Sequence, residues 1–74
     1  MSVPPLRQLF AQNVRRLRKA KRWSQEELGT HTGIHRTYIG AIERGEANIT
    51  LDHLEKLATG LKTDVVTLLS PLQT

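Results

Sequence analysis

Three side chains that can read DNA bases stand together at positions 36–38, shortly after a glycine at position 33. An arginine can donate two hydrogen bonds to the O6 and N7 atoms of guanine, and a threonine methyl group can contact the methyl group of thymine. These contacts require a helix that presents the side chains at its exposed start, where they enter the major groove. We therefore predict base contacts from one face of such a helix, namely from Arg36, Thr37, Tyr38 and Ala41.

Two of these assignments have alternatives that the sequence leaves open. Arg36 is expected to bind a base, but in the same place it can bind a phosphate or remain solvated. Tyr38 has an amphipathic side chain, so it can instead pack against the preceding helix. Which alternative holds depends on how this helix packs against the rest of the chain.

Phosphate contacts are expected on both sides of this helix. A helix that begins near Ser24 offers free backbone amides and the positive end of its dipole, both of which attract phosphate. The serine has capping of that helix as its alternative role, and both roles can coexist. Contacts of this kind position a protein on DNA without reading its sequence. The predicted phosphate contacts are Ser24, Gln25, His35, Arg44, Asn48 and Thr50.

Local signals predict the helices that position these residues. Ser24 and Glu27 form a capping box, in which the serine oxygen accepts the Glu27 amide and the glutamate reaches back. Gly33 can adopt the positive φ that ends this helix, and Gly29 is a weak helix former expected at a close approach between helices. Apolar residues recur at helical spacing. The sequence predicts helices at about 5–20, 24–31, 35–44, 50–60 and 63–69.

The length favours a single domain that covers residues 1–74, and the five predicted helices, without any strand pattern, make it an all-α domain. A chain this short buries only about 60–65% of its unfolded surface, which leaves little room for an enclosed cavity. The sequence shows no nucleophile–base pair, no carboxylate pair with a pocket and no glycine-rich phosphate loop. We therefore expect a docking surface rather than an enzyme, and no cofactor.

The net charge of +4 is distributed unevenly along the chain. Residues 1–40 carry eight Lys and Arg against two Glu, whereas residues 41–74 carry three basic residues against five acidic ones. A basic half suits a phosphate-binding face, with a separate face for another contact. The alternative is a solvated basic helix that keeps the protein in solution.

Other sites and locations are excluded by residue type or spacing. The chain has no cysteine, so disulfides and thiolate metal sites are excluded. His31 and His35 have the spacing of a zinc pair, but Gly33 lies between them and no third ligand is near, so no metal site is expected. No apolar run approaches the roughly 20 residues of a membrane span. We expect a cytoplasmic protein that does not associate with a membrane.

The last predicted helix carries more apolar residues than its own packing needs. We predict that some of them form a two-fold dimer contact; the alternative is that all pack back onto the first and fourth helices. A dimer would present two reading helices about 34 Å apart, one turn of DNA, and would bind a pseudo-palindromic operator. The predicted dimer residues are Leu61, Val65, Val66, Leu68, Leu69 and Leu72.

Residues 10–69 resemble the Cro/C1-type (Xre-like) helix-turn-helix family, which includes phage repressors. The resemblance rests on the linked segments LRKAKRWSQEEL, HRTYIGAIERG and TLDHLEKLATGL. The string RTYIGAIERG followed by ANIT is similar to controller proteins of bacterial restriction–modification systems. Two positions depart from the family pattern: His35 stands where a small N-cap residue or aspartate is usual, and Gly29 where alanine is usual.

The resemblance implies a compact five-helix, lambda-repressor-like domain that regulates transcription by binding double-stranded operator DNA as a homodimer. It also implies a structural ion pair between Arg18 and Glu43, because similar proteins join the first and third helices in this way. RNA polymerase is a further expected partner. The alternative is an antitoxin-like or phage-repressor-like module whose main partner is another protein.

Overall fold

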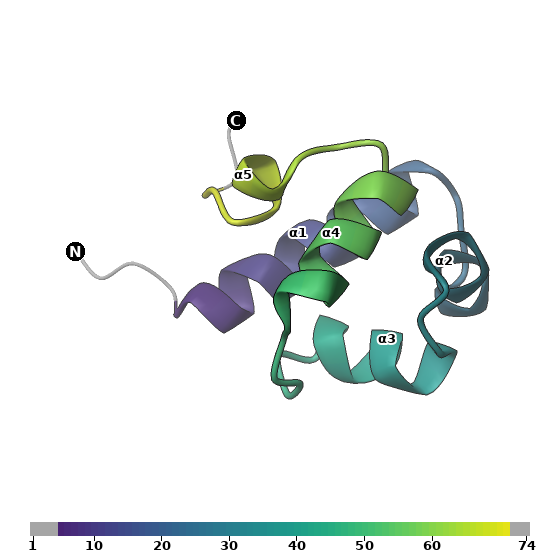
Figure 1. The fold of residues 1–74 in the computed structure, drawn as a ribbon, viewed down its shortest axis with the longest axis horizontal. Coiled ribbons are helices and arrows are strands. Elements are labelled where there is room, and N and C mark those ends of the chain that lie inside the picture. The colour runs from purple at the N-terminus through teal and green to yellow at the C-terminus, as the bar shows by residue number, and fades with distance from the viewer. Residues whose placement is uncertain (1–4, 72–74) are drawn as a thin grey trace.

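The computed structural model describes residues 5–71, and this part of the chain is folded into α-helices with no strand. The helices are α1 (Leu6–Ala20), α2 (Gln25–Thr32), α3 (Arg36–Glu43), α4 (Leu51–Gly60) and α5 (Val65–Leu68). In Figure 1, α2 and α3 lie at one end of the molecule, and α5 lies at the opposite end from α2. Helix α3 packs on α1 and α2, while α5 packs on α1 and α4. The prediction of an all-α fold is confirmed.

All five helices begin one or two residues later than the sequence indicated. In four of them, the preceding residue has an extended or near-extended backbone, and its side chain accepts a hydrogen bond from an amide in the first turn. A side chain that caps in this way satisfies an amide that has no partner within the helix. The residues that cap the four helices are Ser24, His35, Thr50 and Asp64.

The core forms where the apolar faces of the five helices meet. Each helix contributes at least one buried apolar residue, and the largest of them are fully buried. Members of this core include Phe10, Val14, Leu28, Ile39, Ile42, Leu57, Leu61 and Leu68.

Two residues of the predicted dimer contact belong to this core instead. Leu61 is 3% exposed and Leu68 is 0% exposed in the single chain. Side chains with so little accessible surface have almost none left to bury against a second chain, so their assignment to a dimer contact was wrong. The alternative, that these residues pack back onto the other helices, holds for both. Leu72 lies outside the described residues.

A buried asparagine on α1, which the sequence did not single out, anchors α5. Asn13 is 1% exposed, and its side-chain amide donates hydrogen bonds to the carbonyls of Leu68 and Ser70, each at 2.8 Å. A buried amide needs such partners, because an unsatisfied one would cost about 1–3 kcal/mol. The contact therefore fixes the end of a helix of only four residues.

Gly29 lies where α2 meets the turn that leads into α3. A Cβ atom placed there would lie 2.5 Å from the backbone oxygen of Ile34, which is closer than real Cβ atoms approach. The close approach predicted at this position is therefore confirmed. The absence of the family's usual alanine is explained by this contact, and glycine is the residue that fits here.

Candidate nucleic-acid interface

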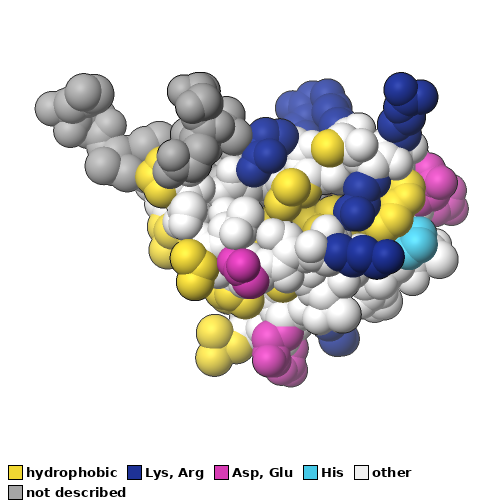
Figure 2. Space-filling model, turned by 90° about the horizontal axis from the view of Figure 1, so that it is seen from above, with side chains coloured by type: hydrophobic (Ala, Val, Ile, Leu, Met, Phe, Trp, Pro, Cys, Tyr) yellow, Lys and Arg dark blue, Asp and Glu magenta, His cyan; other side chains and the backbone are white. Residues whose placement is uncertain are grey.

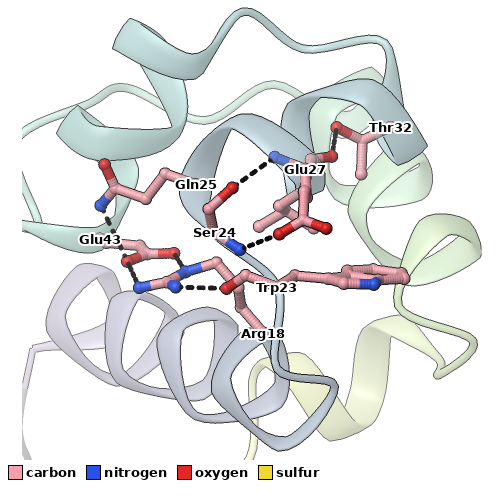
Figure 3. Close-up of polar contacts among 8 residues, drawn as sticks. Arg18, Trp23, Ser24, Gln25, Glu27, Thr32 and Glu43 are labelled. Carbon is pink, nitrogen blue, oxygen red and sulfur yellow. Dashed lines mark hydrogen bonds and ion pairs between the residues drawn. The ribbon is translucent and has the colours of Figure 1, made fainter.

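The helix α2 begins with the capping box that the sequence predicts. Ser24 Oγ accepts the Glu27 amide at 3.0 Å, and the Ser24 amide donates to Glu27 Oε1 at 2.8 Å (Figure 3). At the other end, Gly33 has φ 74°, and its amide donates to the Gly29 carbonyl. The left-handed glycine ends α2 and redirects the chain into α3 after only a short turn.

His35 caps the helix that follows, although histidine is an unusual residue for this role. Its Nδ1 accepts the backbone amide of Thr37 at 3.1 Å. The ring thus replaces the small oxygen-bearing residue that is usual at an N-cap. His35 was predicted to contact phosphate, and because Nδ1 is engaged, only Nε2 is left to do so.

Arg36 and Thr37 follow on the first turn of α3, and both are exposed. The side chain of Arg36 is 65% exposed, and its Nη1 lies 3.6 Å from Glu26 Oε2 on α2. Ala41 lies one turn beyond Thr37 and is half-buried. The start of α3 is thus open to an incoming partner.

Tyr38 does not pack against α2, which was the alternative to a base contact. Its hydroxyl donates a hydrogen bond to the backbone carbonyl of Asn48, in the connection between α3 and α4. Its ring lies against His53 of α4, with ring centroids 4.6 Å apart. The side chain is half-buried and packs towards α4 rather than α2. The exposed part of Tyr38 remains the candidate for the predicted base contact.

A buried ion pair joins α3 to α1. Arg18 Nε and Nη2 donate to the two carboxylate oxygens of Glu43 at 2.7 and 2.9 Å, as Figure 3 shows. The arginine also donates to the Trp23 carbonyl at 2.7 Å. The side chains of Arg18 and Glu43 are 11% and 3% exposed. The hydrogen bond with Glu43 raises the pKa of Arg18 above its ordinary value, so this guanidinium is charged at any working pH.

Gln25 connects this pair to the start of α2. Its side-chain amide donates to Glu43 Oε1 at 3.1 Å (Figure 3). The predicted phosphate donor is thus already engaged within the chain, which fixes the start of α2 against the end of α3. Phosphate contact by Gln25 would use the remaining N–H of the amide or its backbone.

The predicted phosphate contacts beyond α3 are exposed, and each already has a partner within the chain. Arg44 Nε donates to Glu46 at 3.0 Å. Thr50 Oγ1 accepts the His53 amide at 3.1 Å and so caps α4. Asn48 accepts a hydrogen bond at 3.0 Å from Arg7, an exposed arginine of α1 that the sequence analysis did not select.

An open hollow brings together predicted base and phosphate contacts from α2 and α3. No short sequence window contains this set, because the turn at Gly33 folds the two helices against each other. The hollow is lined by Ser24, Gln25, Glu26, Arg36, Thr37, Gly40 and Arg44.

Basic charge is not confined to this interface. Figure 2 views the molecule from the side opposite α3, and several Lys and Arg side chains lie on that face. Hydrophobic side chains are also uncovered there. The excess of basic residues in 1–40 therefore overstates the positive charge on the α3 face. Geometry, rather than net charge, identifies the interface.

Within residues 5–71, no three His, Asp or Glu side chains gather in a way that could hold a metal ion. In the same part of the chain, no helix is both long enough and apolar enough to span a membrane.

Two helices joined by a glycine turn, with the second held on α1 and its start exposed, form a helix-turn-helix unit. The family model HTH_3, described as helix-turn-helix, matches residues 14–68. The chain therefore belongs to this family, which is of the Cro/C1 type.

Similar proteins include control proteins from two bacteria. C.SmaI of Serratia marcescens is 46% identical over 65 residues, which are 88% of this chain and 77% of that protein. C.BamHI of Bacillus amyloliquefaciens is 47% identical over 57 residues, which are 76% of this chain and 70% of that protein. The resemblance to controller proteins is confirmed, and because such relatives are not enzymes, neither is this chain.

Solved structures agree with the fold. The restriction–modification controller protein C.AhdI from Aeromonas hydrophila has a TM-score of 0.80 at 42% identity, covering 84% of this chain and 94% of that one. A hypothetical transcription factor, NHTF from Neisseria, has a TM-score of 0.87 at 42% identity, covering 96% of this chain and 85% of that one.

Proposed function

We propose that this chain is a sequence-specific transcription regulator that binds operator DNA through α3 and controls a restriction–modification system. The observation that carries this proposal is the exposed start of α3, where Arg36 and Thr37 adjoin the capped start of α2. The names of C.SmaI, C.BamHI and C.AhdI support control of restriction–modification genes. We place the protein in the cytoplasm, together with its DNA.

Base recognition and positioning are assigned to different parts of the interface. Arg36 is the candidate for a bidentate contact with guanine, and one such pair contributes about 1–3 kcal/mol of discrimination against other bases. Amides and side chains at the start of α2 and beyond the end of α3 are the candidates for phosphate contacts. They would hold α3 in register in the major groove without reading bases.

We further propose that the protein acts as a homodimer through the exposed side of α5. Val66 is 74% exposed, and Val65 and Leu69 beside it are half-buried. An exposed valine flanked by two partly accessible apolar residues suits contact with a second copy related by a two-fold axis. Such a dimer would bind a pseudo-palindromic site with half-sites about 34 Å apart. Contact with RNA polymerase remains a prediction.

The dimer is tested by sedimentation velocity over a range of protein concentrations, combined with hydroxyl-radical footprinting on DNA from upstream of the gene. We expect a concentration-dependent dimer and two protected patches one helical turn apart. Val66→Asp should give monomers. Leu51 is a matched control, since it is 77% exposed but lies on α4, so Leu51→Asp should still dimerise. A monomer at all concentrations, or a single protected patch, would overturn the dimer.

A further inference from the structure

An ion pair crosses the gap between α2 and α3 beside the candidate base contact. Glu26 Oε2 lies 3.6 Å from Arg36 Nη1, and the two side chains are 72% and 65% exposed. We propose that Glu26 is a positioning residue that holds the Arg36 guanidinium in the orientation needed to read a base. This inference rests on the proposed function, because it assigns Glu26 a part in the same interface.

A carboxylate at this place needs an explanation, because a DNA-facing acid repels phosphate. Glu26 and Glu27 both lie in the first turn of α2, where the helix dipole favours an acid, but only Glu27 takes part in the capping box. Glu26 also differs from Glu27 in its position. It lines the hollow between the helix starts and a second hollow along the turn, and Arg36 lines both. Both members of the pair therefore belong to the walls of both hollows.

The physical role follows from the length of the arginine side chain. A free arginine on an exposed surface samples many rotamers, and ordering it on a base opposes binding. A carboxylate beside Nη1 restricts this motion and leaves the other N–H donors of the guanidinium to bind a guanine. An exposed pair is weak. The pair should therefore change discrimination severalfold, without being needed for folding.

The test compares base preference among three variants that keep α2 intact. Glu26→Gln removes the charge and the ion pair, whereas Glu26→Asp keeps the charge but shortens the reach towards Arg36. Glu27→Gln is the matched control: it removes the same charge one residue away, and glutamine can serve in a capping box. Each protein is used to select sites from a random duplex library, with Arg36→Ala identifying the base position that Arg36 reads.

We expect both Glu26 variants to lose about two- to five-fold in preference for the favoured base at that position. Glu27→Gln should keep the wild-type preference, although lower negative charge raises its affinity for all DNA. If Glu26→Asp behaves like the wild type, the charge alone matters and the positioning role is overturned. Unchanged preference in both Glu26 variants also overturns it, while the proposed function stands. A wild-type protein with no preferred site would overturn the proposed function itself.

Discussion

The buried pair of Arg18 and Glu43 gives the sharpest stability prediction. Glu43→Ala removes both carboxylate oxygens and leaves the guanidinium of Arg18 largely buried. Removing one partner of a buried pair costs about 3–5 kcal/mol. We expect about 3 kcal/mol, at the lower end of this range, because Arg18 keeps its hydrogen bond to the Trp23 carbonyl and its side chain is 11% exposed.

This loss is large for so small a domain. A chain of 74 residues has a free energy of unfolding of about 4–11 kcal/mol, and 3 kcal/mol corresponds to a fall in Tm of about 12–24 °C. Urea unfolding can be followed through the fluorescence of Trp23, the chain's single tryptophan, and by circular dichroism. Glu55→Ala is the control, because Glu55 is an exposed acid on α4.

A double variant separates two quantities: the cost of leaving the Arg18 charge buried without its partner, and the net contribution of the ion pair to stability. Arg18→Met combined with Glu43→Leu should recover most of the lost stability, because hydrophobic residues of similar volume often replace a buried pair at little cost. If Glu43→Ala unfolds within about 0.5 kcal/mol of the wild type, as surface substitutions usually do, the pair does not hold α3 on α1 and our reasoning fails.

Three further predictions concern the close approach at Gly29 and the anchoring and capping of α5. Gly29→Ala should lower stability by about 1–3 kcal/mol in urea unfolding, because its Cβ would meet the Ile34 carbonyl. Helix propensity alone predicts the opposite, a gain of about 1 kcal/mol. A more stable variant would therefore contradict the close approach. Asn13→Ala should lower stability by about 2–3 kcal/mol and speed hydrogen exchange in α5, because it removes the side-chain hydrogen bonds to the carbonyls of Leu68 and Ser70. Unchanged exchange in α5 would show that these bonds do not anchor the helix. Hydrogen bonds from Thr67 lower the pKa of Asp64 below its ordinary value of 3.8. The cap therefore stabilises α5 above about pH 4 and loses this effect as the pH falls through the folded-state pKa. Asp64→Asn should remove that pH dependence in an acid titration of α5 amide signals.

Features encoded within a few residues were predictable from the sequence. The capping box of Ser24 and Glu27 and the left-handed turn at Gly33 depend on neighbours close in the chain, and both are present. The pairing of Arg18 with Glu43 spans 25 residues, and only the family resemblance indicated it. Local chemistry thus located the helix-turn-helix, and the resemblance supplied one long-range contact.

Features that depend on distant packing were not predictable in this way. In the sequence Asn13 looks like an ordinary polar residue, because the carbonyls that it binds, at and just beyond the end of α5, lie more than 50 residues later in the chain. An asparagine within the apolar stripe of α1 was the only signal. Likewise, the spacing of the apolar residues does not show which side of α5 faces inward. Leu68 and Val66 were therefore both predicted as dimer contacts, although Leu68 is buried and Val66 is exposed.

The central claim is that α3 reads DNA sequence through Arg36. The most direct test is a gel-shift titration with DNA from upstream of the gene, with wild type and Arg36→Ala side by side in excess random competitor. We expect the wild type to stay bound, and Arg36→Ala to bind this DNA no better than the competitor. If random DNA displaces the wild type equally well, or if Arg36→Ala keeps its preference, the assignment of α3 and Arg36 is contradicted.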